Sequence, residues 1–190
     1  MIMNTRKNGQ VRVLHLDDEP LILEITRLHL ERTGTITVTS VESAEEALTR
    51  LNESRYDAVI SDYEMPDLDG IGFLKKIRDM GYDLPFILYT GKGREEVVIR
   101  AFNNGATFYL QKGGDVRSMF AELGQKVNQA AGQYRSRQKL HHLHRIFRGL
   151  RTVSGTLQGN EELDQRLRKV CGYCASHLGY NQVRIALFDQ

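Results

Sequence analysis

Five short apolar runs recur along the first half of the chain, each separated from the next by a stretch with helical periodicity. They cover residues 11–16, 36–41, 58–61, 86–89 and 107–110. Apolar runs of this length, rich in β-branched and aromatic side chains, are typical of buried β-strands. The pattern therefore predicts five strands with a helix after each one.

The segments between these runs carry apolar residues three or four positions apart, which predicts helices. The first helix is expected to begin at Pro20, because a proline costs nothing in the first turn. The second is expected to begin after Ser43, which together with Glu46 forms the pattern of a capping box. Further helices are expected over residues 71–81 and 95–103, and a last one starts near residue 115.

Strands that alternate with helices predict a parallel sheet that is covered on both faces. We therefore predict an α/β fold of the flavodoxin-like, doubly wound class, with five strands in the order 2-1-3-4-5 and a C-terminal helical extension. In that order the first and third strands lie side by side at the switch point. Ligands bind there, outside the carboxyl ends of the strands.

Polar side chains stand at the carboxyl ends of four of the predicted strands. They are Asp17 and Asp18, Asp62, Thr90, and Lys112. Three carboxylates brought together repel one another unless a cation lies among them. Mg²⁺ suits such a site because it takes one or two carboxylates and bridges to phosphate. Since an aspartate can accept a phosphoryl group, the pattern indicates phosphoryl transfer.

Four segments in this order resemble the receiver domain of two-component signalling proteins. They are LHLDDEP at 14–20, SDYEMPDLDG at 61–70, YTG at 89–91 and YLQK at 109–112. The resemblance runs from about residue 11 to about residue 132. It implies that a histidine kinase or a phosphotransfer protein donates the phosphoryl group. The family usually has a proline after the lysine, often with a cis bond; Gly113 stands there instead, so the resemblance does not carry the cis bond over to this chain.

The resemblance also implies a role for each residue of the site. Asp62 would be the phospho-acceptor, Lys112 would pair with the phosphoryl group, and Thr90 with Tyr109 would form the conformational switch. Mg²⁺ would be bound by Asp18, by Asp62, by the backbone carbonyl of Glu64, and by Asp17 through a water molecule.

The sequence divides into four expected parts. Residues 1–10 form a flexible N-terminus, 11–132 the receiver, 133–158 a helical linker, and 159–190 the truncated start of a second domain that resembles a GAF sensor domain. The linker carries an apolar stripe of Leu143, Ile146, Leu150, Val153 and Leu157. Such a stripe is expected to form a short parallel two-helix coil, and therefore a weak homodimer.

Composition limits the remaining alternatives. The chain has a net charge of +2 and two cysteines, and no apolar run approaches the ~18 residues of a membrane span. With no signal peptide in residues 1–10, a cytoplasmic location is expected. The receiver also resembles those at the front of multidomain sensor kinases, yet the chain has no kinase phospho-accepting histidine motif and no ATP-binding motif.

Two other functions compete with the phospho-signalling interpretation. An aspartate-nucleophile phosphatase of the haloacid-dehalogenase type carries Asp-x-Asp after its first strand, whereas here Asp62 and Glu64 follow the third. A DNA-binding regulator would use the basic residues beyond residue 126, but no helix-turn-helix pattern accompanies them. Nucleic acid is therefore not an expected partner.

Overall fold

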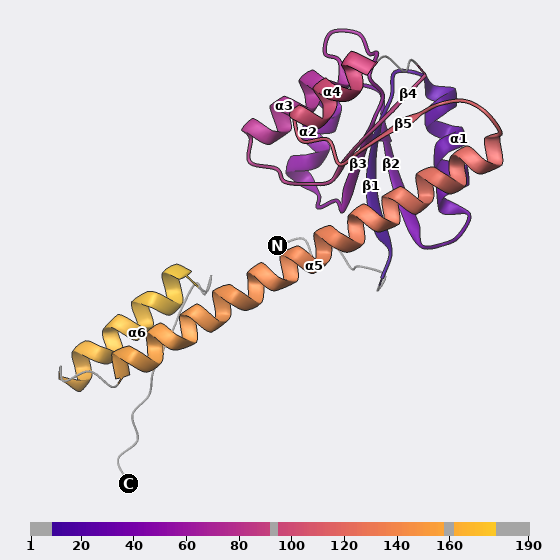
Figure 1. Cartoon of the computed structure of the whole chain (residues 1–190). Coiled ribbons are helices and arrows are strands. Elements are labelled where there is room, and N and C mark those ends of the chain that lie inside the picture. The colour runs from indigo at the N-terminus through magenta and orange to yellow at the C-terminus, as the bar shows by residue number, and fades with distance from the viewer. Residues whose placement is uncertain (1–8, 92–94, 158–161, 178–190) are drawn as a thin grey trace. The chain divides into compact units, whose positions relative to one another are not determined.

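The computed structural model describes residues 9–91, 95–157 and 162–177, and its strands form a single parallel sheet (Figure 1). The strands are β1 (Val11–Leu16), β2 (Ile36–Val41), β3 (Ala58–Ser61), β4 (Phe86–Thr90) and β5 (Phe108–Gln111). They follow the order β2-β1-β3-β4-β5. The predicted fold class, strand order and C-terminal helical extension are confirmed.

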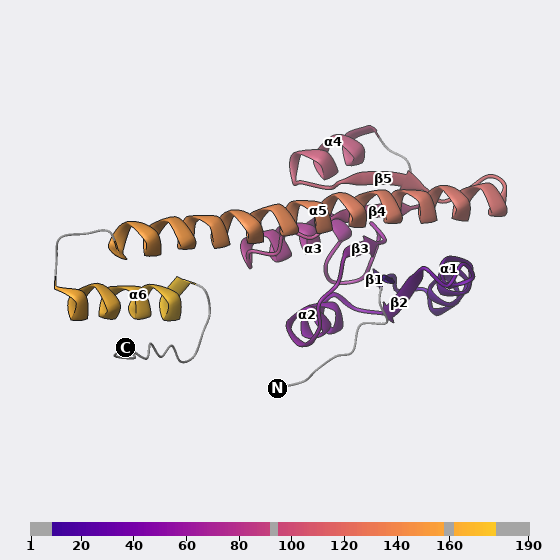
Figure 2. The ribbon, with the colours of Figure 1, turned by 90° about the horizontal axis from the view of Figure 1, so that it is seen from below.

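Helices follow each strand and cover both faces of the sheet. They are α1 (Pro20–Glu31), α2 (Ala44–Glu53), α3 (Gly70–Asp79), α4 (Glu95–Asn103) and α5 (Val116–Leu157), with α6 (Leu163–His177) beyond them. The predicted caps are present: Pro20 lies in the first turn of α1, and the Ser43 side chain accepts the N–H of Glu46 at 3.2 Å. Figure 2 shows α1 and α2 on opposite sides of β1 and β2.

Two buried apolar clusters, one on each face, hold the helices on the sheet. One joins Leu14 and Leu16 of β1 to side chains of α2, α3 and α4, such as Phe73. The other joins Val13 to α1 and α5, where Leu123 is completely buried. Because neighbouring residues of a strand point to opposite faces, β1 is apolar on both sides. The acidic residues Asp17 and Asp18 follow directly at its carboxyl end.

By its contacts the chain forms two compact units, residues 1–135 and 136–190, and α5 contributes to both. The first unit ends on an anchoring contact. Arg135 donates to both carboxylate oxygens of Asp57, at 2.8 and 2.6 Å, and to the backbone carbonyls of Gly9 and Gln10. Asp57 also accepts the N–H of Arg12 at 2.9 Å. Arg135 therefore fixes this turn of α5 to the amino end of the sheet.

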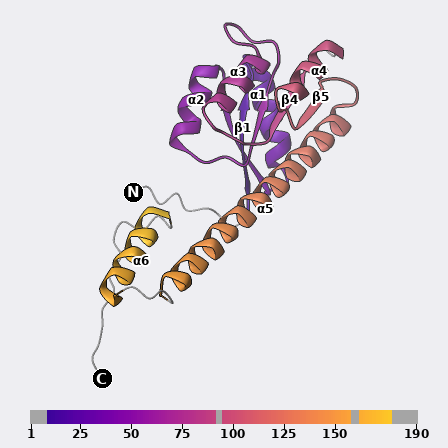
Figure 3. The same ribbon diagram turned by 60° about the vertical axis from the view of Figure 1, so that its left-hand side comes forward.

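The second unit contains the rest of α5 and α6, which lie side by side in all views (Figure 3). The polar residues 135–139 shift the register of the apolar stripe but do not interrupt the helix. Leu140, Leu143 and Phe147 are exposed on α5. The side chains of Leu150 and Leu157, and residues 178–190 of the expected second domain, lie outside the described residues. Among the helices described, none is long and apolar enough to cross a membrane.

Candidate functional site

The site lies where β1 and β3 end side by side. Leu16 pairs with Ser61 in the parallel register, and the N–H of Asp62 donates to the carbonyl of Leu16 at 2.8 Å. Asp17 directly follows Leu16, the last residue of β1, and Asp62 directly follows Ser61, the last residue of β3. The strand order therefore brings two carboxylates from sequence positions far apart to one place, as the switch-point rule predicts.

Lys112 bridges these two carboxylates. Its Nζ lies 2.6 Å from Oδ2 of Asp17 and 2.7 Å from Oδ1 of Asp62. The backbone N–H of Lys112 donates to the carbonyl of Thr90 at 2.7 Å, which fixes the lysine at the end of β5. Asp17 is fully buried and Asp62 is only 6% exposed, so each needs a cationic partner. The structure therefore brings together three of the predicted site residues.

Backbone N–H groups hold the outer oxygens of the same carboxylates. Glu64 N donates to Oδ2 of Asp62 at 2.5 Å, and Glu19 N donates to Oδ1 of Asp17 at 3.0 Å. Both oxygens of each aspartate are thus engaged. The two side chains are held in fixed orientations, which is what a group transfer that depends on positioning requires.

The charges of the site shift its pKa values in identifiable ways. Burial raises the pKa of Asp62 and Asp17 adds to the rise, while the ammonium of Lys112 opposes it. Burial alone would lower the pKa of Lys112, but its hydrogen bonds to Asp17 and Asp62 raise it overall. The lysine therefore stays protonated across the physiological range. Its Nζ also lies 5.5 Å from the centre of the Tyr89 ring, and burial raises the pKa of that tyrosine to about 12.

Asp18, another predicted metal ligand, is exposed and stands outside this bridge. Among the described residues no group of three His, Cys, Asp or Glu side chains is arranged to hold a metal. The donor chemistry nevertheless fits Mg²⁺, because two carboxylates at the mouth of a sheet, with Asp18 next to them in sequence, are hard oxygen ligands. Oδ2 of Asp17 and Oδ1 of Asp62 both accept a hydrogen bond from Nζ of Lys112, so the lysine is the cation between the two carboxylates here.

Thr90 and Tyr109, the predicted switch pair, lie on neighbouring strands. Thr90 ends β4 and is 1% exposed, whereas Tyr109 of β5 is half-buried against the cluster that contains Leu88. Leu88 pairs with Tyr109 in the register, and Thr90 lies two residues further along the same strand. Alternate residues of a strand share a face, so both side chains lie on the α4 side of the sheet.

Two residues near the site have roles that the sequence did not reveal. A Cβ on Gly70 would lie 2.1 Å from the carbonyl oxygen of Asp62 and 2.8 Å from Cδ1 of Leu88. Only glycine therefore allows α3 to begin so close to Asp62. His15 is fully buried on β1, and neither of its ring nitrogens has a hydrogen-bond partner. Burial, with the nearby Lys112, lowers the pKa of His15 to about 3, so it is neutral.

The bond that follows Lys112 is trans, since no cis peptide bond occurs in the described residues. Gly113 and Gly114 adopt φ values of 149° and 82°, which side chains other than glycine rarely accept. The N–H of Gly113 donates to Sδ of Met119 at 3.3 Å. A glycine turn therefore takes the position of the proline expected in related proteins.

Comparison with solved structures gives the same fold. The receiver domain of the Francisella response regulator 1452 superposes with a TM-score of 0.60 at 30% identity, covering 65% of this chain and 98% of that one. A response regulator receiver domain protein from Clostridium thermocellum superposes with a TM-score of 0.59 at 31% identity, covering 68% of this chain and 98% of that one.

Curated relatives match the same part of the chain. The two-component response regulator ORR22 of Oryza sativa subsp. indica is 38% identical over 104 residues, 54% of this chain and 15% of that protein. The response regulator SaeR of Staphylococcus epidermidis is 38% identical over 100 residues, 53% of this chain and 43% of that protein. The chain thus spans less than half the length of either relative. The sequence model of the response regulator receiver domain matches residues 13–124. The chain therefore belongs to the response regulator receiver domain family.

Proposed function

We propose that Asp62 accepts a phosphoryl group from a histidine kinase or a phosphotransfer protein, and that the modified domain signals through α5. The observation that carries this proposal is the bridge of Lys112 between Asp17 and Asp62, at adjacent strand ends. It supplies a positioned carboxylate nucleophile and a fixed positive charge for a transferred phosphoryl group. No observation favours a phosphatase or a DNA-binding role; Arg135, one of the basic residues of α5, pairs with Asp57.

Mg²⁺ is the cofactor of this proposal, as it generally is in receiver domains. Asp18, Asp62, the Glu64 carbonyl and, through water, Asp17 would hold it, and it would neutralise phosphate charge beside the acceptor. Asp17 would keep its orientation through Glu19, and Lys112 would contact the phosphoryl oxygens. The single charge of the lysine balances only one of the two buried carboxylates, which supports a second cation at this end of the sheet.

The test of this function is labelling by a small-molecule phosphodonor. Incubation with acetyl phosphate and Mg²⁺ should add one phosphoryl group to the wild-type chain and none to Asp62→Asn. Asp67→Asn is the matched control, because it makes the same change of charge at an exposed position of the same loop. Equal labelling of Asp62→Asn and the wild type would exclude Asp62 as the acceptor.

Thr90 and Tyr109 are proposed to pass the modification to the α4 side of the sheet. The Thr90 hydroxyl would donate to a phosphoryl oxygen, and the half-buried ring of Tyr109 would move inward. Thr90→Ala should still bind beryllofluoride, a phosphoryl mimic, but should lose most of the NMR shift changes around Tyr109. Thr49→Ala, an exposed hydroxyl on α2, should keep them. Full wild-type shifts in Thr90→Ala would contradict the coupling.

The segments beyond the receiver are proposed to form an output connection. Residues 133–158 would act as a helical linker, and 159–190 would begin a GAF-like domain, as in a multidomain sensor kinase or regulator. Within the described residues, α6 supplies one helix of such a domain. The receiver itself is proposed to occupy residues 11–132, so the anchored Arg135 would lie at the start of the linker.

A weak homodimer is proposed to form through the linker helix. Leu140, Leu143 and Phe147 lie within two turns of α5 and are 58%, 39% and 66% exposed. The same residues of a second chain would cover them in a short parallel two-helix coil, and Leu143 belongs to the stripe predicted from the sequence. Ultracentrifugation should show concentration-dependent dimers that disappear after truncation at Gly132 or in Leu143→Asp. Gln138→Asp, with the same added charge, should keep the dimers. Dimers that survive both the truncation at Gly132 and Leu143→Asp would place the interface elsewhere.

A further inference from the structure

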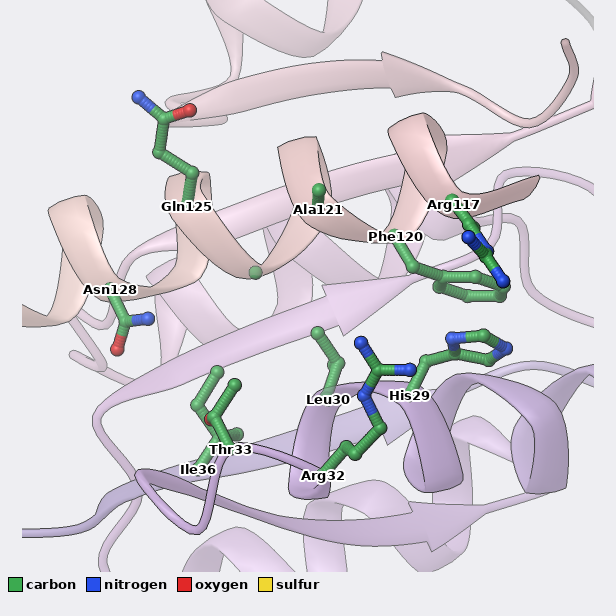
Figure 4. A pocket seen from close by; sticks show the side chains of 11 residues that line it. His29, Leu30, Arg32, Thr33, Ile36, Arg117, Phe120, Ala121, Gln125 and Asn128 are labelled. Carbon is green, nitrogen blue, oxygen red and sulfur yellow. The ribbon is translucent and has the colours of Figure 1, made fainter. Parts of the chain in front are cut away.

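A groove lies between the end of α1 and the first turns of α5, and none of its lining residues belongs to the bridge of Asp17, Asp62 and Lys112. Its volume is about 610 Å³, within the range of small-molecule sites. The side chains that line it come from both helices and from the segment leading into β2. They include His29, Arg32 and Thr33 on one side, and Arg117, Phe120 and Asn128 on the other (Figure 4).

The groove is positively charged. Arg32, after the end of α1, and Arg117, in the first turn of α5, both line it, and among the described residues that line it none is acidic. Neither guanidinium forms an ion pair with a described residue. Two guanidiniums without acidic partners repel each other, and an anion placed between them would remove that repulsion. Guanidinium groups also match the geometry of phosphate oxygens with two parallel hydrogen bonds.

The rest of the groove is a fixed scaffold. The rings of His29 and Phe120 stack at 4.3 Å with an interplanar angle of 9°, which joins α1 to α5 beside the two arginines. Leu30 and Ile36 form an apolar floor. Gly124 places no side chain over this floor, and a Cβ there would lie 3.6 Å from Cδ2 of Leu30. The groove is therefore larger than a single phosphate ion requires.

We propose that this groove binds a small phosphorylated molecule, with its phosphate between Arg32 and Arg117 and its remaining atoms over Leu30 and Ile36. Asn128 and Thr33 would serve as neutral hydrogen-bond donors at the opposite end. None of the residues that line this site belongs to the bridge of Asp17, Asp62 and Lys112, so the proposal does not rest on Asp62 being the phospho-acceptor. Binding would join α1 to the first turn of α5, where Arg117 lies five residues after Lys112.

Inorganic pyrophosphate is a suitable probe, used with the full chain, EDTA and about 0.15 M salt so that neither divalent ions nor weak surface attraction contribute. Calorimetry should show saturable binding of one pyrophosphate per chain. Arg32→Gln and Arg117→Gln should each weaken it at least about tenfold, since each removes a charged hydrogen-bond donor. Arg55→Gln removes an equal charge from an exposed position on the α2–β3 connection and should leave the affinity unchanged.

Two further measurements distinguish binding in this groove from binding at the aspartates and from general attraction of anions. Asp62→Asn should bind pyrophosphate like the wild type; a changed affinity in that variant, in either direction, would move the ligand to the acidic site and overturn the proposal. Citrate should bind more weakly, and equal affinity would overturn the assignment to phosphate chemistry. The absence of saturable binding up to millimolar pyrophosphate, or an equal loss in Arg55→Gln, would also overturn it. Thermal unfolding without ligand verifies that every variant is folded.

Discussion

Gly70→Ala is expected to lower the free energy of unfolding by about 3 kcal/mol, the upper end of the usual cost of overpacking. The added Cβ would lie 2.1 Å from the backbone oxygen of Asp62, a distance that no side-chain rotation can relieve. Either α3 or the loop after β3 must move. Because that loop positions Asp62 and Glu64, labelling by acetyl phosphate should fall with stability. Urea denaturation followed by circular dichroism measures the first effect.

Gly132→Ala is the matched control for this substitution. Gly132 lies within α5, and a Cβ there would meet nothing within 4 Å. Alanine should raise stability by roughly 0.5–1 kcal/mol, because it restricts the unfolded chain and favours the helix. A Gly70→Ala protein as stable as the wild type would show that α3 begins farther from Asp62 than the structure has it.

Lys112→Met is expected to have the second large effect. It leaves Asp17 and Asp62 buried without the ammonium between them, and breaking a buried pair in this way costs about 3 kcal/mol. Asp62→Asn in the same background should recover much of the loss, since it removes one of the two negative charges. A double variant no more stable than Lys112→Met would show that the bridge does not link these side chains.

The stability of the single variant Lys112→Met should depend on pH in a defined direction. Burial raises the pKa of Asp62 in the folded state, so the folded protein holds that proton more tightly than the unfolded chain does. Ionised Asp62 therefore costs stability above its pKa, and the cost declines as pH falls and the carboxyl is protonated. Without Lys112 this cost grows. The stability deficit of Lys112→Met should thus be smaller at about pH 5 than at about pH 7.5, measured by urea denaturation against wild type.

Much of this fold can be predicted from the sequence because its signals are local. Each strand is a short apolar run, and Ser43 with Glu46 marks a helix start that the structure reproduces. Parallel topology then places the ends of β1 and β3 together. The proximity of Asp17, Asp62 and Lys112 could therefore be anticipated from strand order alone.

Other features depend on contacts between distant residues and leave no local pattern. Arg135 has the appearance of one more base on a polar helix face, yet it meets Asp57 across 78 residues of sequence. The need for Gly70 becomes visible only when the carbonyl of Asp62 is placed beside it. Arg32 and Arg117 face one groove because α5 crosses α1, an arrangement set by packing that periodicity does not encode.

The most direct test of the central claim is to locate the phosphoryl group on the wild-type chain. After treatment with acetyl phosphate and Mg²⁺, borohydride reduces an aspartyl phosphate to homoserine, and peptide mass spectrometry identifies the altered residue. We predict that homoserine appears at Asp62 alone, and only when Mg²⁺ is present. Homoserine at Asp17 or Asp18, or the same yield in the presence of EDTA, would contradict the assignment of Asp62 as the metal-dependent phospho-acceptor.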